Sequence, residues 1–197
     1  MIKKNEVFYG KILMFGEYGV IFNSMALTIP YTHFKGELSF ISKYKYTDLE
    51  WAEESNRSLR KYASHLVELQ KSNGAGCSLD LHRFAKDLER GLYFESSIPQ
   101  GYGVGSSGAL VAAIYDKYAE EKIRSDRRLS SKSVFRLKDI FSRMEAYYHG
   151  KSSGLDPLNC YIQYPLLIKD SHEIETVAIP RNKFDKNGAI FLINSGK

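Results

Sequence analysis

Cysteine and proline are both scarce in this chain of 197 residues, which contains two cysteines and five prolines. Cys77 and Cys160 lie far apart without the spacing of a metal site, which predicts reduced thiols buried as small hydrophobic residues. No apolar run approaches the roughly 20 residues that a membrane-spanning helix needs. The opening segment MIKKNEVFYGK contains no apolar core of a secretory signal. These absences argue against disulfide-stabilised and membrane-spanning classes and predict a cytoplasmic protein.

Acidic residues are outnumbered: 23 aspartates and glutamates accompany 28 lysines and arginines, for a formal net charge of +5. This balance suits an anionic ligand. The densest basic segment, residues 122–132, is of the kind that usually forms a solvated loop, so nucleic-acid binding is only a minor alternative. A hydrophobic content of 43% is ordinary for a globular protein of one large or two small domains.

The spacing of apolar residues predicts strands toward both ends of the chain and helices in its middle, which defines an α+β class. Thr47 and Asp48 are expected to cap a long helix that ends near Asn73. Two further helices are predicted over 107–122 and 132–148. Strands are expected over 6–15, 18–29, 36–46, 77–83, 91–98, 160–169, 175–180 and 189–194.

Residues 98–109, with the sequence IPQGYGVGSSGA, form the most informative segment. Alternating glycines permit positive φ angles and let the backbone approach a ligand closely. A helix that starts at Ser106 and Ser107 directs unpaired N–H groups and a positive dipole end toward the loop, where phosphate binds readily. The two hydroxyls can cap the helix, ligate a cation, or do both. We interpret the loop as a phosphate cradle; a serine-capped turn without a ligand is the alternative.

The two commonest nucleotide-binding loops do not fit this segment. A P-loop requires a lysine after its last glycine, and none follows Gly105. Gly103, Gly105 and Gly108 have the spacing of a dinucleotide fingerprint, but the charged region beyond Tyr118 supplies no second strand. The loop therefore predicts a phosphate site of another type.

Three segments of the chain resemble the signature blocks of the GHMP kinases, which include galactokinase, homoserine kinase, mevalonate kinase and phosphomevalonate kinase. Residues 9–18, YGKILMFGEY, are similar to the PGKxxLxGEH block of mevalonate kinases. Residues 98–109 resemble the block PxxxGLGSS(A/G)A, and residues 149–156, HGKSSGLD, resemble HGxPSGxD. Three blocks in the right order are far more specific than one, and together they most resemble mevalonate kinase.

This resemblance implies transfer of the γ-phosphoryl group of ATP to an alcohol, with ATP and Mg²⁺ as cofactors. Asp156 would be the base that takes the hydroxyl proton, and Lys11 would hold Asp156 ionised. Mg²⁺ would be ligated by Ser107 and Glu145. The ATP-binding residues implied are Pro99, Gly101, Gly103, Val104, Gly105, Ser106, Ser107 and Gly108. The residues implied to face the acceptor are Glu17, Tyr18, Ser153 and Gly154.

Taken without the family, the same residues have plainer interpretations: Lys11 as an edge-strand lysine, Asp156 as part of a turn and Glu145 as a solvated helix residue. The chain also departs from mevalonate kinases, because Tyr18 stands where they usually carry histidine and Ser152 replaces a proline. These departures leave the acceptor open. Mevalonate is the leading choice, a phosphomevalonate kinase or sugar kinase is the alternative within the family, and a non-catalytic nucleotide-binding module is the alternative from another class.

The resemblance also implies a domain organisation. Residues 1–185 would form the N-terminal ATP-binding domain, with the fold of a ribosomal protein domain, and residues 186–197 would only begin a C-terminal domain that is otherwise absent. Weak or no turnover is expected from such a portion, since closure over the substrate would be lost. A small-molecule alcohol is the expected partner, nucleic acid and membrane are not expected, and a homodimer is left open.

Overall fold

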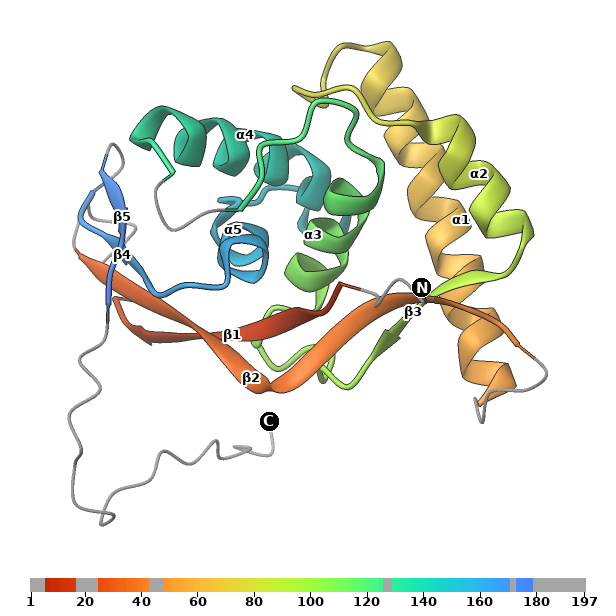
Figure 1. The fold of residues 1–197 in the computed structure, drawn as a ribbon, viewed down its shortest axis with the longest axis horizontal. Coiled ribbons are helices and arrows are strands. Elements are labelled where there is room, and N and C mark those ends of the chain that lie inside the picture. Colours follow the sequence, from red (N-terminus) through yellow and green to blue (C-terminus); the bar gives the residue numbers. More distant parts are fainter. Residues whose placement is uncertain (1–5, 17–24, 43–47, 126–128, 171–172, 179–197) are drawn as a thin grey trace, which may run out of the picture.

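The computed structural model describes residues 6–16, 25–42, 48–125, 129–170 and 173–178. Within these residues one antiparallel sheet carries helices on one of its faces (Figure 1). The α+β class expected from the sequence is confirmed. The elements are β1 (Phe8–Phe15), β2 (Ala26–Phe40), α1 (Leu49–Lys71), α2 (Leu81–Glu89), β3 (Leu92–Ser96), α3 (Ser106–Tyr118), α4 (Ser131–His149), α5 (Leu155–Ile162), β4 (Leu166–Ile168) and β5 (Ile174–Thr176).

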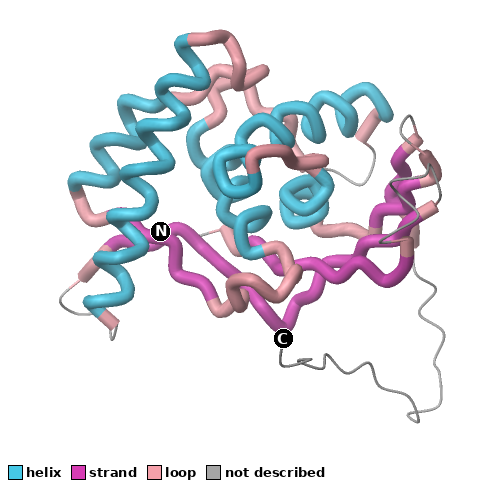
Figure 2. The backbone as a smooth tube through the Cα atoms, turned by 180° about the vertical axis from the view of Figure 1, so that it is seen from behind, coloured by secondary structure: helices cyan, strands magenta, loops and turns pink. Residues whose placement is uncertain are grey.

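Strand β2 organises the sheet, because three other strands pair with it. Its first residues pair with β4, its middle with β1 and its last residues with β3, and β5 extends the sheet from β4. The tube drawn from behind shows the strands as one continuous layer across the molecule (Figure 2). The register between β1 and β2 shifts at Tyr9/Gly10 and at Leu13/Phe15. Such bulges bend a strand and turn its side chains toward new neighbours.

Helix α3 is the central element of the hydrophobic core. Eight of its residues are buried, and Ala109, Ala112 and Tyr115 lie among those with 0% exposure. A helix that is apolar on nearly all sides must be covered on all sides. Contacts with the sheet and with α5, α4 and α2 provide this cover. The small alanines let α3 approach its neighbours closely, which fixes where its N-terminus lies.

The predicted helices that begin near 48 and 132 are confirmed, as is Asp48 as the cap of the first, whereas the cap of the second, Ser130, was not predicted. Asp48 Oδ1 accepts from the N–H of Trp51 at 3.1 Å at the start of α1. Ser130 Oγ accepts from the N–H of Ser133 at 3.2 Å at the start of α4. These bonds satisfy N–H groups that the first helical turn leaves without partners. Thr47, the other predicted cap residue, lies outside the described residues.

The strand predicted over 77–83 is wrong, because α2 begins at Leu81. Asp80 caps this helix by accepting from the N–H of Arg83 at 2.9 Å. Phe84 and Leu88 then follow Leu81 at helical spacing and enter the core. Alternating apolar residues before Asp80 predicted a strand. The cap at Asp80 and the helical spacing after it determine the structure instead.

The strand predicted over 160–169 is also wrong in its first half, which belongs to α5. Pro157 is tolerated there because the first turn of a helix leaves its N–H groups unbonded anyway. Gln163 ends α5 in the left-handed conformation, with φ of 58°, and only 166–168 form a strand. The strands predicted over 18–29 and 36–46 merge where they are described into the long β2, and 189–194 lies outside the described residues.

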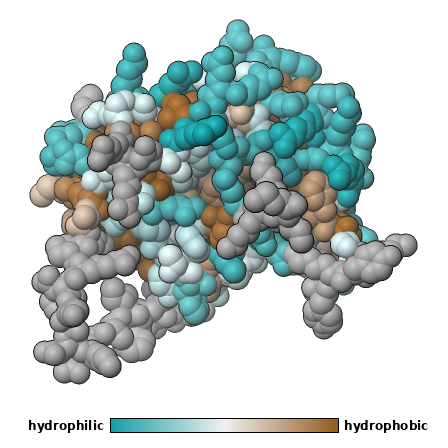
Figure 3. Space-filling view, in the orientation of Figure 1, coloured by the Kyte–Doolittle hydropathy of each residue, from teal (hydrophilic) through white to brown (hydrophobic). Residues whose placement is uncertain are grey.

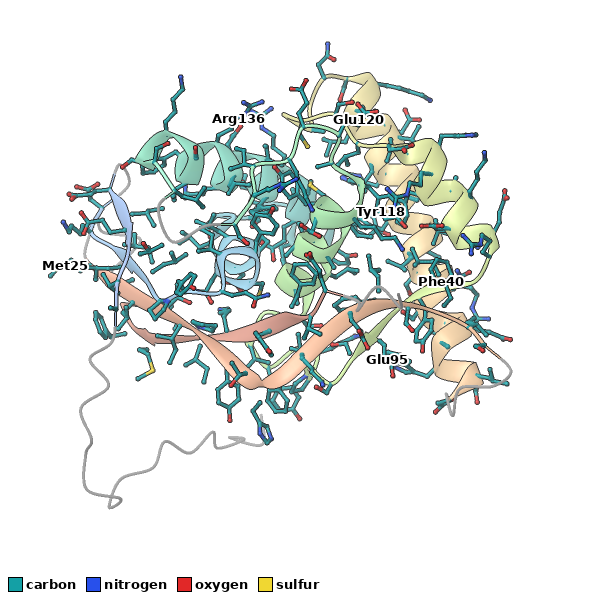
Figure 4. All side chains as sticks on the ribbon, in the orientation of Figure 1. Met25, Phe40, Glu95, Tyr118, Glu120 and Arg136 are labelled. Carbon is teal, nitrogen blue, oxygen red and sulfur yellow. The ribbon has the colours of Figure 1, made fainter. Side chains whose placement is uncertain are left out.

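The surface of the described part is mainly polar over the outer helices. Hydrophilic residues cover the region of α1 and α2 in the space-filling view (Figure 3). Large exposed apolar side chains also occur at the end of β1 and just before β2, where Phe15 and Met25 are 52% and 59% exposed. Met25 is labelled in Figure 4. Among the described residues, no helix combines the length and apolar character needed to cross a membrane.

The turn between α4 and α5 provides a test of the fold. Gly154 has a φ of 73°, and a Cβ there would overlap the carbonyl oxygen of Lys138 on α4. We expect Gly154→Ala to lower the free energy of unfolding by about 3 kcal/mol, since a left-handed backbone and an overpacked contact each cost about 1–2 kcal/mol. Urea denaturation followed by circular dichroism measures this loss.

Gly103→Ala is the matched control, because Gly103 has a similar φ of 69° but no described heavy atom within 4 Å of its ideal Cβ. It is expected to cost only the backbone term of about 1–2 kcal/mol. Equal losses in the two variants would show that the contact with α4 does not determine this turn.

Candidate active site

Strand β1 meets the glycine loop at Lys11. The backbone N–H of Lys11 donates to the carbonyl oxygen of Val104 at 2.9 Å. Gly10 makes this approach possible, because a Cβ at that position would lie only 2.9 Å from the same oxygen. The sequence pair Gly10-Lys11 therefore fixes the loop to the edge of the sheet and sets the Lys11 side chain beneath it.

The alternating glycines adopt the conformations that their sequence pattern predicts. Gly101, Gly103 and Gly105 have φ angles of 80°, 69° and 83°, which residues with a side chain rarely adopt. No described heavy atom lies within 4 Å of an ideal Cβ at Gly101 or Gly103, so the backbone there is open to a ligand. At Gly105 a Cβ would lie 2.9 Å from Cγ of Lys11, so this glycine is also needed for packing.

Helix α3 begins at Ser106, directly after the loop. Its N-cap residue is Gly105, and no side chain of the described residues caps it. The expectation that Ser106 and Ser107 could cap the helix is therefore wrong: both are within its first turn. Their backbone N–H groups remain available to an anion, and the positive end of the helix dipole lies at the same place.

Helices α3 and α5 approach each other at their first turns. A Cβ at Gly108 would lie 2.8 Å from both the carbonyl carbon of Asp156 and the nitrogen of Pro157. Helix α5 likewise starts after a glycine, Gly154, without a side-chain cap. Two uncapped N-termini therefore lie side by side, and both favour negative charge in the space next to Asp156.

Lys11 and Asp156 form an ion pair at this junction. Lys11 Nζ lies 3.0 Å from Asp156 Oδ1. The Lys11 side chain is 10% exposed, whereas that of Asp156 is 39% exposed. A nearly buried ammonium group requires a counter-charge, and Asp156 supplies it while keeping part of its carboxylate accessible.

A second carboxylate, Glu145, lies at the end of α4 beside Ser107. Ser107 Oγ donates to Glu145 Oε1 at 2.9 Å, and it lies 3.1 Å from Nε2 of His149. A serine hydroxyl can donate one hydrogen bond, and Ser107 donates its bond to Glu145. Nε2 of His149 must therefore donate to Ser107 Oγ. Glu145 and His149 are four residues apart and therefore share one face of α4.

Ser152 binds the other oxygen of the same carboxylate. Its hydroxyl donates to Glu145 Oε2 and accepts from the N–H of Gly154 at 3.0 Å. In the sequence, Ser152 stands out only as a departure from the family block, and no role is predicted for His149. The spacing of four residues from Glu145 to His149 was a signal that could have identified the histidine, whereas the Ser152 contact depends on the turn.

Burial raises the pKa of Glu145 above its ordinary value. The residue is 3% exposed, so loss of hydration favours the protonated acid, and the negative charge of Asp156 acts in the same direction. Hydrogen bonds from Ser152 and Ser107, together with the charge of His149, oppose this shift. The plain interpretation of Glu145 as a solvated helix residue is therefore wrong.

The oxygens of Ser107 and Glu145 fit a small hard cation. Magnesium binds oxygen at about 2.0–2.1 Å with octahedral geometry, so two adjacent ligands lie about 2.9 Å apart. Oγ of Ser107 and Oε1 of Glu145 are separated by 2.9 Å. The described residues contain no group of three or more metal-ligating side chains, so phosphate oxygens and water would have to complete the coordination.

The remaining predicted site residues are placed as follows. Pro99 is half-buried and Val104 is buried within the loop. Ser153 is exposed, and its Oγ accepts from the N–H of Leu155 at 3.3 Å at the start of α5. Glu17 and Tyr18 lie outside the described residues. The structure thus brings the loop, Lys11, Glu145 and Asp156 together, while their roles remain predictions.

Comparison with known proteins identifies the family. The sequence model of the GHMP kinases N terminal domain matches residues 61–163, which is more than half of the chain. The chain therefore belongs to the GHMP kinases through their N-terminal domain. This confirms the resemblance found in the three sequence blocks. No curated protein sequence matches the chain.

The solved structures that the chain matches include mevalonate kinases. They include the L. major enzyme in complex with R-mevalonate (15% identity, TM-score 0.48) and the enzyme of methicillin-resistant Staphylococcus aureus MRSA252 (18%, 0.44). A third mevalonate kinase has 16% identity and a TM-score of 0.49. The matches cover 91%, 87% and 89% of this chain but 53%, 54% and 56% of the three enzymes. The chain thus spans about half the length of these proteins.

The raised pKa of Glu145 predicts a pH-dependent effect of its removal. The folded chain binds more protons than the unfolded chain between the ordinary glutamate pKa of 4.5 and the raised value, so stability falls as pH rises through this window. Glutamine cannot ionise, so the stability of Glu145→Gln does not fall with pH in this way. We expect the variant to be more stable than the parent chain at neutral pH, with the gain shrinking to nothing below pH 4.5.

Thermal and urea denaturation at several pH values measure this difference. Glu68→Gln on the exposed side of α1 is the matched control for loss of one carboxylate. If the difference in stability between Glu145→Gln and the parent chain does not change with pH, burial does not raise the pKa of Glu145.

Proposed function

We propose that the chain is the nucleotide-binding and catalytic part of an ATP-dependent small-molecule kinase that phosphorylates an alcohol, with mevalonate as the acceptor. The observation that carries this proposal is the Lys11–Asp156 ion pair at the junction of two uncapped helix N-termini. Membership in the GHMP kinases supports the reaction class. The proposal is supported by the proximity, within one region, of the open glycine loop, the oxygens of Ser107 and Glu145, and the partly exposed carboxylate of Asp156.

The triphosphate would bind along the glycine loop. Backbone N–H groups at the start of α3 point into this region, and the open backbone at Gly101 and Gly103 allows close contact. The helix dipole adds a favourable interaction with the negative charge. This arrangement binds phosphate mainly through the backbone, which explains why a lysine after the last glycine is not required.

Magnesium would be held by Ser107 and Glu145. When bound, Mg²⁺ offsets negative charge on the phosphate oxygens. The buried carboxylate suits this role, because the same desolvation that raises its pKa strengthens its interaction with a cation. His149 would orient the Ser107 hydroxyl through its hydrogen bond.

Asp156 would act as the base and Lys11 as its partner. The proton of the acceptor hydroxyl passes to a carboxylate oxygen of Asp156 as the hydroxyl oxygen attacks the γ-phosphorus and the bond to the β-phosphate oxygen breaks. Lys11, whose Nζ lies 3.0 Å from Asp156 Oδ1, would offset negative charge that develops near that oxygen. The partial exposure of Asp156 leaves space for an alcohol to approach.

The choice of acceptor comes from the sequence blocks at 9–18 and 149–156, which most resemble those of mevalonate kinases. Glu17, Tyr18, Ser153 and Gly154 are proposed to face the acceptor. Phosphomevalonate or a sugar would replace mevalonate if these positions select another alcohol. A cytoplasmic location is proposed alongside the activity, and a homodimer is left open.

Replacement of the proposed base tests the mechanism. Asp156→Asn keeps the shape of the side chain but cannot accept the proton in the same way, so we expect phosphate transfer to fall about 10²–10⁴-fold. Affinity for a non-hydrolysable ATP analogue with Mg²⁺, measured by calorimetry, should stay nearly unchanged. Transfer of radiolabelled phosphate to mevalonate, phosphomevalonate and galactose measures both the rate and the acceptor, and it is followed in the full-length protein because this portion alone is expected to turn over weakly or not at all.

Asp139→Asn is the matched control, because Asp139 is 59% exposed on α4 and pairs only with Arg143 in the described ion pairs. It should leave binding and transfer unchanged. Unaltered transfer by Asp156→Asn would refute the base assignment. Transfer to galactose alone would refute mevalonate as the acceptor, and absence of nucleotide binding to the parent chain would refute the kinase proposal.

A further inference from the structure

Two hydrogen bonds hold Ser152 in addition to the one that its hydroxyl donates to Glu145. Its carbonyl oxygen accepts from Ser142 Oγ on α4 at 2.5 Å. Its own hydroxyl oxygen accepts from the N–H of Gly154, the N-cap residue of α5. Because one side of the hydroxyl is occupied by that N–H, its single proton is directed to Glu145 Oε2. The turn therefore determines the direction in which the Ser152 hydroxyl donates its hydrogen bond.

The two oxygens of Glu145 have different surroundings. Oε1 accepts a hydrogen bond from Ser107 in the first turn of α3, where the open glycine loop ends. Oε2 is bonded to Ser152 in the closed turn between α4 and α5. Gly154 in that turn is packed so closely on Lys138 and Ser142 that a Cβ would not fit. Only Oε1 therefore lies on the side from which a ligand can approach.

This asymmetry matters for the choice of cation. Magnesium requires near-octahedral coordination and takes one oxygen from each carboxylate, whereas calcium accepts six to eight ligands and often uses both oxygens of one carboxylate. A carboxylate oxygen that accepts one hydrogen bond keeps a second lone pair, but the fixed Ser152 hydroxyl holds Oε2 in the closed turn and leaves Oε1 toward the loop. This orientation suits coordination by one oxygen, as Mg²⁺ prefers, and disfavours the two-oxygen contact that calcium often makes.

We infer that Ser152 is a positioning residue that makes the site select Mg²⁺ over Ca²⁺, by holding Glu145 Oε2 so that the carboxylate presents Oε1 alone. This inference rests on the proposed function, which assigns Glu145 to the metal. The role differs from that of Ser107, whose hydroxyl would itself contact the cation. Ser152 acts only through Glu145.

The test measures cation binding directly. Mg²⁺ and Ca²⁺ displace Mn²⁺ from the 197-residue chain in the presence of a non-hydrolysable ATP analogue, and electron paramagnetic resonance reports the free Mn²⁺. Loss of a partner that orients a metal ligand typically costs 10–100-fold in affinity. We expect Ser152→Ala to weaken Mg²⁺ about tenfold and Ca²⁺ by less than about threefold, so the preference for Mg²⁺ falls several-fold.

Two further variants separate positioning from a structural role. Ser152→Thr retains the hydroxyl and is expected to restore the parent preference, while Ser152→Cys retains the shape with a weak donor and should behave as the alanine variant does. Ser64→Ala on the exposed part of α1 is the matched control, since its hydroxyl bonds only within that helix, to the carbonyl of Arg60 at 3.2 Å. Circular dichroism confirms folding, and the cysteine variant replaces the alanine variant if the latter unfolds.

The outcomes distinguish the inference from the function on which it rests. If the parent chain binds cation and nucleotide, but the alanine and cysteine variants keep its preference for Mg²⁺, the role of Ser152 is refuted and the kinase proposal stands. If the parent chain binds neither cation nor nucleotide, the proposed function fails and this inference fails with it. A several-fold loss of preference that threonine restores supports the inference.

Discussion

The close approach of α3 and α5 at Gly108 is the contact on which the site depends. The first turns of these helices meet with no room for a Cβ, so the residues that follow each N-cap are placed side by side. A helix N-terminus attracts negative charge over about one turn, and two adjacent N-termini act on the same space. Any side chain at position 108 would separate Ser107 from Asp156 and divide the site into two unrelated helix ends.

The charges at this junction are arranged so that each has a partner. Lys11, nearly buried, is paired with Asp156, and the buried Glu145 receives hydrogen bonds from Ser107 and Ser152. An unpaired charge at such a depth would cost several kcal/mol, so these contacts are a condition for folding as much as for chemistry. A bound cation and phosphate would add partners to groups that the fold already holds in position.

Much of this arrangement could be predicted from the chain itself. The glycine loop, the helices that carry Ser107 and Glu145, and the blocks that contain Lys11 and Asp156 were all visible as local patterns. Glycine alternation, capping residues and helical spacing are local, because each depends on a few neighbouring residues. Local patterns predicted a strand wrongly at 77–83, where an alternating apolar pattern is followed by a helix cap. They also predicted a strand wrongly in the first half of 160–169, because a buried helix and a buried strand are equally apolar.

The sequence by itself determined that a glycine-rich turn precedes a helix, and that three blocks similar to those of the GHMP kinases follow one another along the chain. Only the tertiary structure decided that Glu145 is buried, that His149 and Ser152 contact its network, and that Ser106 and Ser107 leave α3 uncapped. The physical reason is that burial and hydrogen-bond direction depend on residues far apart in the chain, which meet only when α3, α4 and α5 pack together on the sheet.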